Sequence, residues 1–164
     1  MKLSEMLLKE FDVEVARTHK TLERLPDEKA EYKPHEKSMS LVKLANHVAD
    51  IPAYIPMMFA SEEVDLMQPR ERPVPPANCH ERLERFTSQA TAARERLASA
   101  TDEELEAGFT LRGGERIIFS DPRYFVLRNL FFNHMIHHRA QLGLYLRLND
   151  CPVPSIYGPS ADES

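Results

Sequence analysis

The stretch "NHMIHHRAQLGLYLR", residues 133–147, places three of the seven histidines of the chain within five positions, among leucines. In an α-helix, residues three and four positions apart share one face. That spacing predicts a helix with one face made of Leu127, Leu130, Phe131, His134, His138, Gln141, Leu142 and Tyr145. We therefore expect His134 and His138 to point towards the core and His137 to lie near the edge of this face.

This histidine-bearing helix has start and stop signals in the sequence. Asp121 can cap its N-terminus, and Pro122 can occupy the first turn, where a backbone N–H has no helical partner. The segment after Leu148 contains three prolines and cannot continue the helix. The helix is therefore expected over about 121–148.

Three further segments have helical periodicity: 2–24, from Ser38 or Ser40 to about 58, and about 79–99, with Asn78 as the cap of the last. The second segment is expected to bury an apolar stripe of Leu41, Leu44, Val48, Ile51, Ile55 and Met58. Pro52 cannot donate to the carbonyl of Val48, so the helix is expected to kink or loosen one turn past His47. A segment rich in Pro and Arg, 67–78, is long enough to join the second and third helices in parallel. Four long helices with one long crossover predict an all-α four-helix bundle, as a single domain over 1–164.

Residues 108–119, "GFTLRGGERIIF", break the helical pattern. Residues with β propensity stand on both sides of Gly113 and Gly114, and such a glycine pair suits a tight turn. The sequence therefore predicts a small β-hairpin before the last helix.

Composition and charge exclude several classes of protein. With 164 residues, 42% hydrophobic and 29% charged, the chain is an ordinary soluble domain. Its net charge of −5, without a basic stripe, argues against nucleic acid as a partner. Apolar runs such as 117–119 are far shorter than the roughly 18 residues of a membrane span, and the first residues lack a signal-peptide core. We expect a cytoplasmic protein in which Cys79 and Cys151 are free thiols.

A metal site is one interpretation of the histidines. His47 lies at the margin of the apolar stripe of the second helix, from which it can reach His134 and His138. Neutral imidazoles are good ligands for divalent Zn, Ni or Fe, and three of them leave coordination positions open. Asp50 can accept a hydrogen bond from the second ring nitrogen of His47. The alternative is that these histidines are core residues that bind backbone carbonyls.

Several other residues allow two interpretations. Gln141 either orients a ligand or fills space, and Tyr145 either lines a cavity or belongs to the core. Glu10 and Glu14 lie four residues apart on the first helix and are expected to be solvated. A second apolar strip of the last helix, covered by the hairpin or by another subunit, comprises Phe125, Phe132 and Ile136.

Three stretches resemble the DinB family, the DinB/YfiT-like group of metal-dependent helical proteins: "EFDVEVARTHKTLERLP" (10–26), "KPHEKSMSLVKLANHVADIP" (33–52) and "NHMIHHRAQLGLYLRLNDCPVPSIYGPSADE" (133–163). The resemblance implies a metal triad of His47, His134 and His138, with Zn or Ni as the ion. It also implies an up-up-down-down four-helix bundle that forms a homodimer. Ala140 departs from the family pattern, in which Gly often follows the His-Arg pair.

Two classes of function are open, and the family resemblance bears on the first of them. Some similar proteins are thiol S-transferases or isomerases that use small thiols, and many damage-inducible members have no assigned substrate. The first hypothesis is a metal-dependent enzyme of the thiol S-transferase or hydrolase type, with a small thiol or another small molecule as substrate. The second is a non-catalytic, stress-related dimeric binding or scaffold protein. A third possibility is a metal-free bundle.

Overall fold

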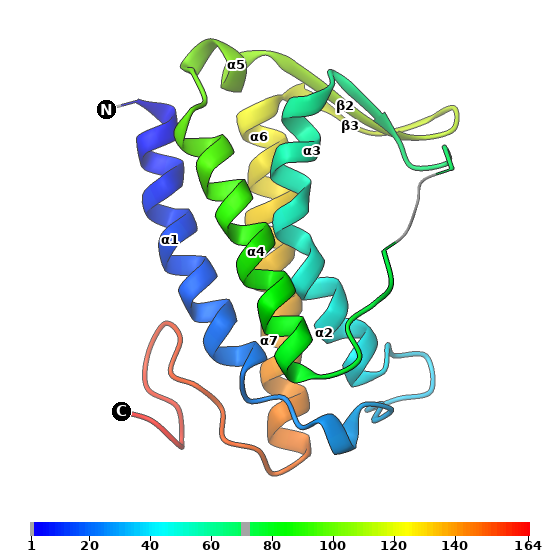
Figure 1. Ribbon diagram of the computed structural model, residues 1–164, viewed down its shortest axis with the longest axis vertical. Coiled ribbons are helices and arrows are strands. Elements are labelled where there is room, and N and C mark those ends of the chain that lie inside the picture. The colour runs from blue at the N-terminus through cyan, green and yellow to red at the C-terminus, as the bar shows by residue number, and fades with distance from the viewer. Residues whose placement is uncertain (1, 70–72) are drawn as a thin grey trace.

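Helices make up most of the structure, a computed structural model that describes residues 2–69 and 73–164. The principal helices are α1 (Leu3–Leu22), α2 (Leu41–Asp50), α3 (Tyr54–Ala60), α4 (Cys79–Ala98), α6 (Arg123–Leu127) and α7 (His134–Leu148) (Figure 1). Shorter elements are η1 (Asp27–Lys29), η2 (Ile51–Ala53), α5 (Asp102–Glu106) and a π-helix, η3 (Arg128–Asn133). The prediction of a mainly helical chain is confirmed.

The second predicted helix is divided in two, as its prolines require. α2 passes through the 3-10 turn η2 into α3, and Pro52 lies in that turn. The expected apolar stripe of this segment is buried and comprises Leu41, Leu44, Val48, Ile51, Ile55 and Met58. The expected loosening past His47 is therefore present as a 3-10 turn, and the stripe is buried on both sides of it.

The helices run in an order that differs from the expected one. In Figure 1, α1 descends, α2–α3 and α4 ascend, and α6–α7 descends. Contacts at both ends of α1 show that α4 is antiparallel to it. The Cys79 thiol donates to the carbonyl of Leu22 at one end, and the Leu3 N–H donates to Asp102, just beyond α4, at the other. The up-up-down-down arrangement implied by the family resemblance is therefore wrong.

Connection geometry explains this order. An up-up-down-down bundle needs two connections that travel the length of the helices. Here the segment between α1 and α2 remains at one end of the helices. Its Tyr32 and Ala30 carbonyls accept hydrogen bonds from the Leu41 and Val42 N–H groups at the start of α2. The connection between α3 and α4 joins parallel helices, as expected for 67–78, although 70–72 lie outside the described residues.

A small sheet lies at the end of the bundle where α3 and α4 finish (Figure 1). Strand β2 (Gly108–Gly113) pairs antiparallel with β3 (Arg116–Pro122), where the sequence predicted a hairpin. The turn between them contains Gly114 at φ +63°, a conformation that favours glycine. A third strand, β1 (Glu63–Asp65), pairs parallel with β2 and was not predicted.

Two predicted helix caps have different outcomes. The Asn78 side chain accepts a hydrogen bond from the Glu81 N–H at 2.9 Å, which confirms it as the cap of α4. Asp121 is not the cap of the last helix, because β3 extends to Pro122 and α6 begins at Arg123. Asp121 instead belongs to β3, where it pairs with Phe109 of β2.

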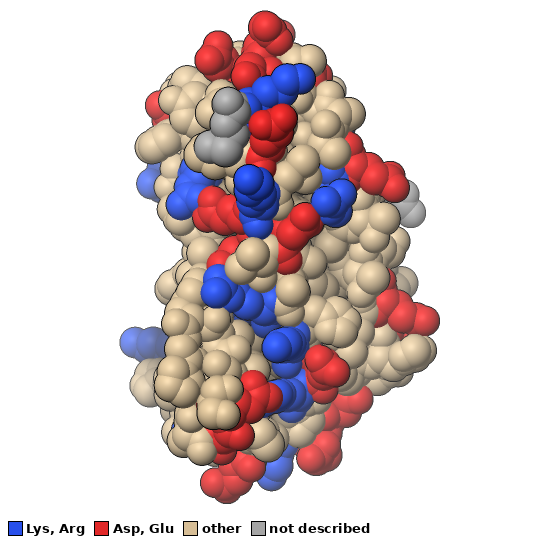
Figure 2. Space-filling view, turned by 90° about the vertical axis from the view of Figure 1, so that its left-hand side faces the viewer, with Lys and Arg blue, Asp and Glu red and all other residues tan. Residues whose placement is uncertain are grey.

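The distribution of charge and of apolar side chains agrees with part of what the sequence predicted. On the face shown in Figure 2, acidic and basic side chains are interspersed and do not form a continuous basic stripe. Within the described ranges, no helix has both the length and the hydropathy that crossing a membrane requires. Cys79 and Cys151 are free thiols, as predicted. Of the second apolar strip, Phe132 is buried and Phe125 is 47% exposed.

Candidate metal centre

Three histidines from two antiparallel helices meet inside the bundle. His47 lies on α2, and His134 and His138 lie one turn apart on α7. One ring nitrogen from each lies within 4.8 Å of the other two, and the ring centroids are 4.6–4.8 Å apart. His138 is buried, whereas the other two are half-buried. The structure thus brings together the three residues singled out from the sequence.

Hydrogen bonds define the tautomers of the two histidines on α7. His134 Nδ1 lies 3.3 Å from the carbonyl of Leu130, and His138 Nδ1 lies 2.7 Å from Oε1 of Gln141. Both of these oxygens can only accept, so each Nδ1 carries the proton and donates it. The Nε2 atoms of His134 and His138 are therefore unprotonated, the state in which imidazole binds a metal.

The third imidazole approaches the same point. His47 Nε2 lies 3.0 Å from His134 Nε2, a separation that requires at least one of the two nitrogens to lack a proton. Two nitrogens that bind one ion at about 2.0–2.1 Å also lie roughly 3 Å apart. The donor set therefore fits a divalent transition-metal ion such as zinc or nickel.

Burial keeps the imidazoles neutral. Desolvation, followed by the neighbouring His47 and His138, lowers the pKa of His134 to about 4. Desolvation also lowers the pKa of His47, and the neighbouring His138 lowers it further. It lowers the pKa of His138 as well, although the hydrogen bond with Gln141 opposes the change. Near neutral pH all three side chains are ready to act as ligands without first losing a proton.

A π-helical turn precedes the two histidines of α7. The π-helix η3 ends at Asn133, and Leu130, the acceptor for His134 Nδ1, lies within it. Such turns are rare and occur frequently at functional sites. The sequence pattern predicted one regular helix over about 121–148, because periodicity over so short a segment does not distinguish π from α geometry.

The expected partner of His47 has another role. Asp50 forms an ion pair with Arg85 at 2.6 Å and accepts a hydrogen bond from Gln89 at 3.3 Å. The proposed hydrogen bond from His47 to Asp50 is therefore not supported. Both partners lie on α4, so the pairing of Asp50 depends on how α2 and α4 pack.

Two alternatives left open by the sequence are resolved. Gln141 orients a histidine, because its Oε1 accepts from His138 Nδ1. Tyr145 is a core residue whose hydroxyl donates to the carbonyl of Met39 at 3.0 Å. His137 is exposed, as its position at the edge of the face predicted, and its ring lies 4.9 Å from that of His138.

Tyr54 is a site residue that the sequence analysis missed. Its ring lies almost parallel to that of His134, at an interplanar angle of 15° and a centroid distance of 6.0 Å. Burial, with a contribution from Asp50, raises the pKa of Tyr54, so the phenol stays protonated at neutral pH. Its position seven residues after His47, two helical turns further along, was the available signal.

Known proteins share this architecture. A crystal structure of a DinB-like protein from Bacillus cereus ATCC 10987 matches with a TM-score of 0.69 and 24% sequence identity, covering 93% of this chain and 97% of that one. At this level of identity the likeness establishes a common fold. No curated protein matches the chain. The sequence model of the DinB family matches residues 1–164, and the chain therefore belongs to the DinB family.

Proposed function

We propose that His47, His134 and His138 bind one divalent metal ion, zinc or nickel, and that the protein is a metal-dependent enzyme of the thiol S-transferase or hydrolase type. The observation that carries this proposal is the convergence of three neutral imidazoles, two of them with an unprotonated Nε2. An ion held by three imidazoles keeps positions open and lowers the pKa of a bound thiol or water.

The surrounding residues support such a site. Leu130 and Gln141 hold the rings of His134 and His138 through their Nδ1 atoms, which fixes both the tautomer and the orientation of each ligand. The Tyr54 ring lies nearly parallel to the His134 ring, at a centroid distance of 6.0 Å, and adds an aromatic wall beside the site. The half-buried position of His47 and His134 favours a site that small molecules can reach.

One observation favours a second candidate function. Asp50, the carboxylate that the sequence placed beside His47, is bound by Arg85 and Gln89, so it is not available as a general base. The second candidate is a stress-related dimeric binding or scaffold protein, in which the same histidines hold a metal without catalysis. The two candidates differ in whether the metal exchanges ligands with small molecules.

Metal content tests the site itself. We expect mass spectrometry of untagged protein to find about one equivalent of metal in the wild type and in His137→Ala, and none in His47→Ala or His134→Ala. His137 is the matched control, because it neighbours His138 on the same helix but is exposed. Equal metal content in all four proteins, or no metal after reconstitution, would leave the three histidines as core residues.

Ligand exchange distinguishes an enzyme from a scaffold. If the site is catalytic, adding a small thiol to the cobalt- or nickel-substituted protein should change its visible absorption spectrum, because thiolate enters an open position. Hydrolysis of an ester substrate would identify the hydrolase type. A spectrum that thiol leaves unchanged, together with no turnover, would favour the scaffold.

We also propose that the protein is a homodimer. Three apolar side chains on the α6–α7 segment are about half exposed: Phe125, Leu144 and Leu148. A second copy that covers them would reduce this exposed apolar surface. Sedimentation at micromolar concentration should give twice the 18.9 kDa chain mass, and a species of 18.9 kDa alone would contradict the proposal.

A further inference from the structure

A buried ion pair joins α7 to α1 directly beside the histidines. Arg139 and Glu14 have side chains only 3% and 5% exposed, and Arg139 Nη2 lies 2.6 Å from Glu14 Oε2. Arg139 Nη1 donates to the backbone carbonyl of Glu14 at 3.1 Å and to the hydroxyl of Thr18 at 3.2 Å. The expectation that Glu14 is solvated is therefore wrong, because α7 supplies its partner.

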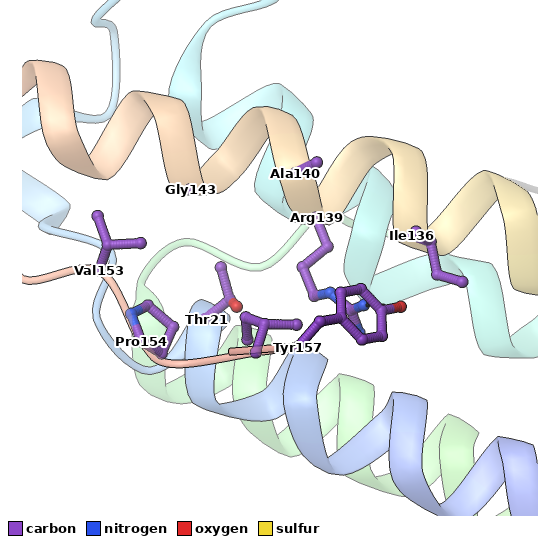
Figure 3. A pocket seen from close by; sticks show the side chains of 9 residues that line it. Thr21, Ile136, Arg139, Ala140, Gly143, Val153, Pro154 and Tyr157 are labelled. Atoms are coloured by element: carbon purple, nitrogen blue, oxygen red, sulfur yellow. Dashed lines mark hydrogen bonds between the residues drawn. The ribbon is translucent and has the colours of Figure 1, made fainter. Parts of the chain in front are cut away.

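The C-terminal tail completes this pair. The Tyr157 hydroxyl donates to Glu14 Oε2 at 2.9 Å and accepts from Arg139 Nη2 at 2.8 Å. The guanidinium of Arg17 lies 4.3 Å from the centre of the Tyr157 ring. Figure 3 shows Arg139 extending from α7 towards Tyr157, which comes from the tail beside α1. Three distant parts of the chain thus meet at one carboxylate.

Apolar packing on this side of α7 is incomplete. A cavity of about 290 Å³ lies between α7 and the tail, and Arg139 and Tyr157 form part of its wall (Figure 3). Most of its other walls are small or apolar side chains, among them Ala140, Val153 and Pro154. Close packing does not hold α7 against the tail on this side, and Arg139 supplies polar contacts from the edge of the cavity to α1.

Arg139 directly follows the histidine that it would influence. Successive helical residues point about 100° apart, so His138 faces α2 while Arg139 faces α1. The π-helical turn before His134 interrupts regular α geometry, so α6 alone does not set the rotation of α7. A metal site needs its ligands held within about 0.5 Å of the productive geometry.

We propose that Glu14, Arg139 and Tyr157 are positioning residues of the metal centre. They set the rotation of α7 about its axis, and its position along that axis, at His138. This inference rests on the proposed metal site and extends it to the C-terminal tail. The tail is then part of the functional unit, because its tyrosine binds both members of the ion pair.

Cobalt(II) affinity, measured by competition with a chelator on the full chain, tests the inference. Tyr157→Phe removes the two hydrogen bonds of the hydroxyl but keeps the ring, and Glu14→Gln removes the charge but keeps the shape. Asp162→Asn is the matched control, because Asp162 holds the tail through Arg147 and the Val153 N–H without touching Arg139. The absorption spectrum of the bound cobalt reports ligand geometry independently of stability.

We expect Tyr157→Phe and Glu14→Gln to weaken cobalt binding about tenfold and to change the cobalt spectrum, because orienting groups typically affect metal affinity on this scale. Asp162→Asn should leave both unchanged. Wild-type affinity and spectrum in Tyr157→Phe would overturn the inference while leaving the metal site intact, even if Glu14→Gln does not fold. A wild-type protein that binds no cobalt would overturn the proposed function, and the inference with it.

Discussion

Replacing Glu14 by Gln should strongly destabilise the metal-free protein. The substitution removes the negative charge and leaves the guanidinium of Arg139 buried without a carboxylate. Removing one partner of a buried ion pair typically costs about 3–5 kcal/mol. We expect the lower end of this range, about 3 kcal/mol, because the Gln side chain can still accept one of the hydrogen bonds.

A second ion pair of α1 offers a matched control. Glu10 lies one turn before Glu14 on α1 and pairs with Arg128 in η3, but the Arg128 and Glu10 side chains are 40% and 32% exposed. Exposed ion pairs contribute at most about 1 kcal/mol. Glu10→Gln should therefore cost less than about 1 kcal/mol, although the two substitutions are chemically identical.

Urea unfolding at neutral pH measures both variants. A chelator is added to every sample, because a metal that binds only the folded state would add its own stabilisation. If Glu14→Gln lowers the free energy of unfolding no more than Glu10→Gln does, then burial of the Arg139–Glu14 pair does not govern its strength.

The cost of Glu14→Gln should also depend on pH. Burial raises the pKa of the Glu14 carboxyl, but hydrogen bonds from Arg139 and Arg17 outweigh it and hold that pKa below its ordinary value of 4.5. The unfolded chain therefore takes up this proton first, and the stabilisation by the carboxylate is lost as the pH falls below 4.5. The difference between wild type and Glu14→Gln should shrink over that range, and a constant difference would contradict this account.

Three further substitutions test the fold. Phe131→Ala should lower the free energy of unfolding in urea by about 3–5 kcal/mol, because Phe131 is fully buried and its ring stacks on that of Phe11 at a centroid distance of 5.3 Å. A smaller loss than that caused by Phe125→Ala, at an exposed position, would contradict this. Gly143→Ala should raise the melting temperature by roughly 3 °C, because a Cβ there meets its nearest atom at 3.9 Å and alanine favours the helix. Gly114→Ala should instead lower stability by about 1 kcal/mol, because its φ of +63° strains other residues; no loss would show that the turn adapts.

Part of the site could be predicted from the sequence because it depends on local spacing. His134 and His138 share a helical face through their four-residue separation, whatever the rest of the chain does. The same logic predicted the buried stripe of α2, the interruption of the helix at Pro52 and the cap at Asn78. Each of these depends on residues a few positions apart, whose relative placement the backbone geometry determines.

Other features were missed because they depend on which elements pack together. Asp50 was assigned to His47 by its position one turn away, but α4 brings Arg85 to it. Strand β1 is only three residues long, and its pairing with β2 involves residues 47 positions apart, such as Val64 and Leu111. Neither pairing has a local signature in the sequence.

The principal helical segments, the histidine face of α7 and membership of the DinB family can be read from the amino-acid sequence. The directions of the helices, the 3.0 Å approach of His47 to His134, and the burial of Glu14 against Arg139, 125 residues away, emerge only when the helices pack. Helical periodicity arises from bonds between near neighbours. The partner of a side chain across the bundle depends instead on how whole helices pack.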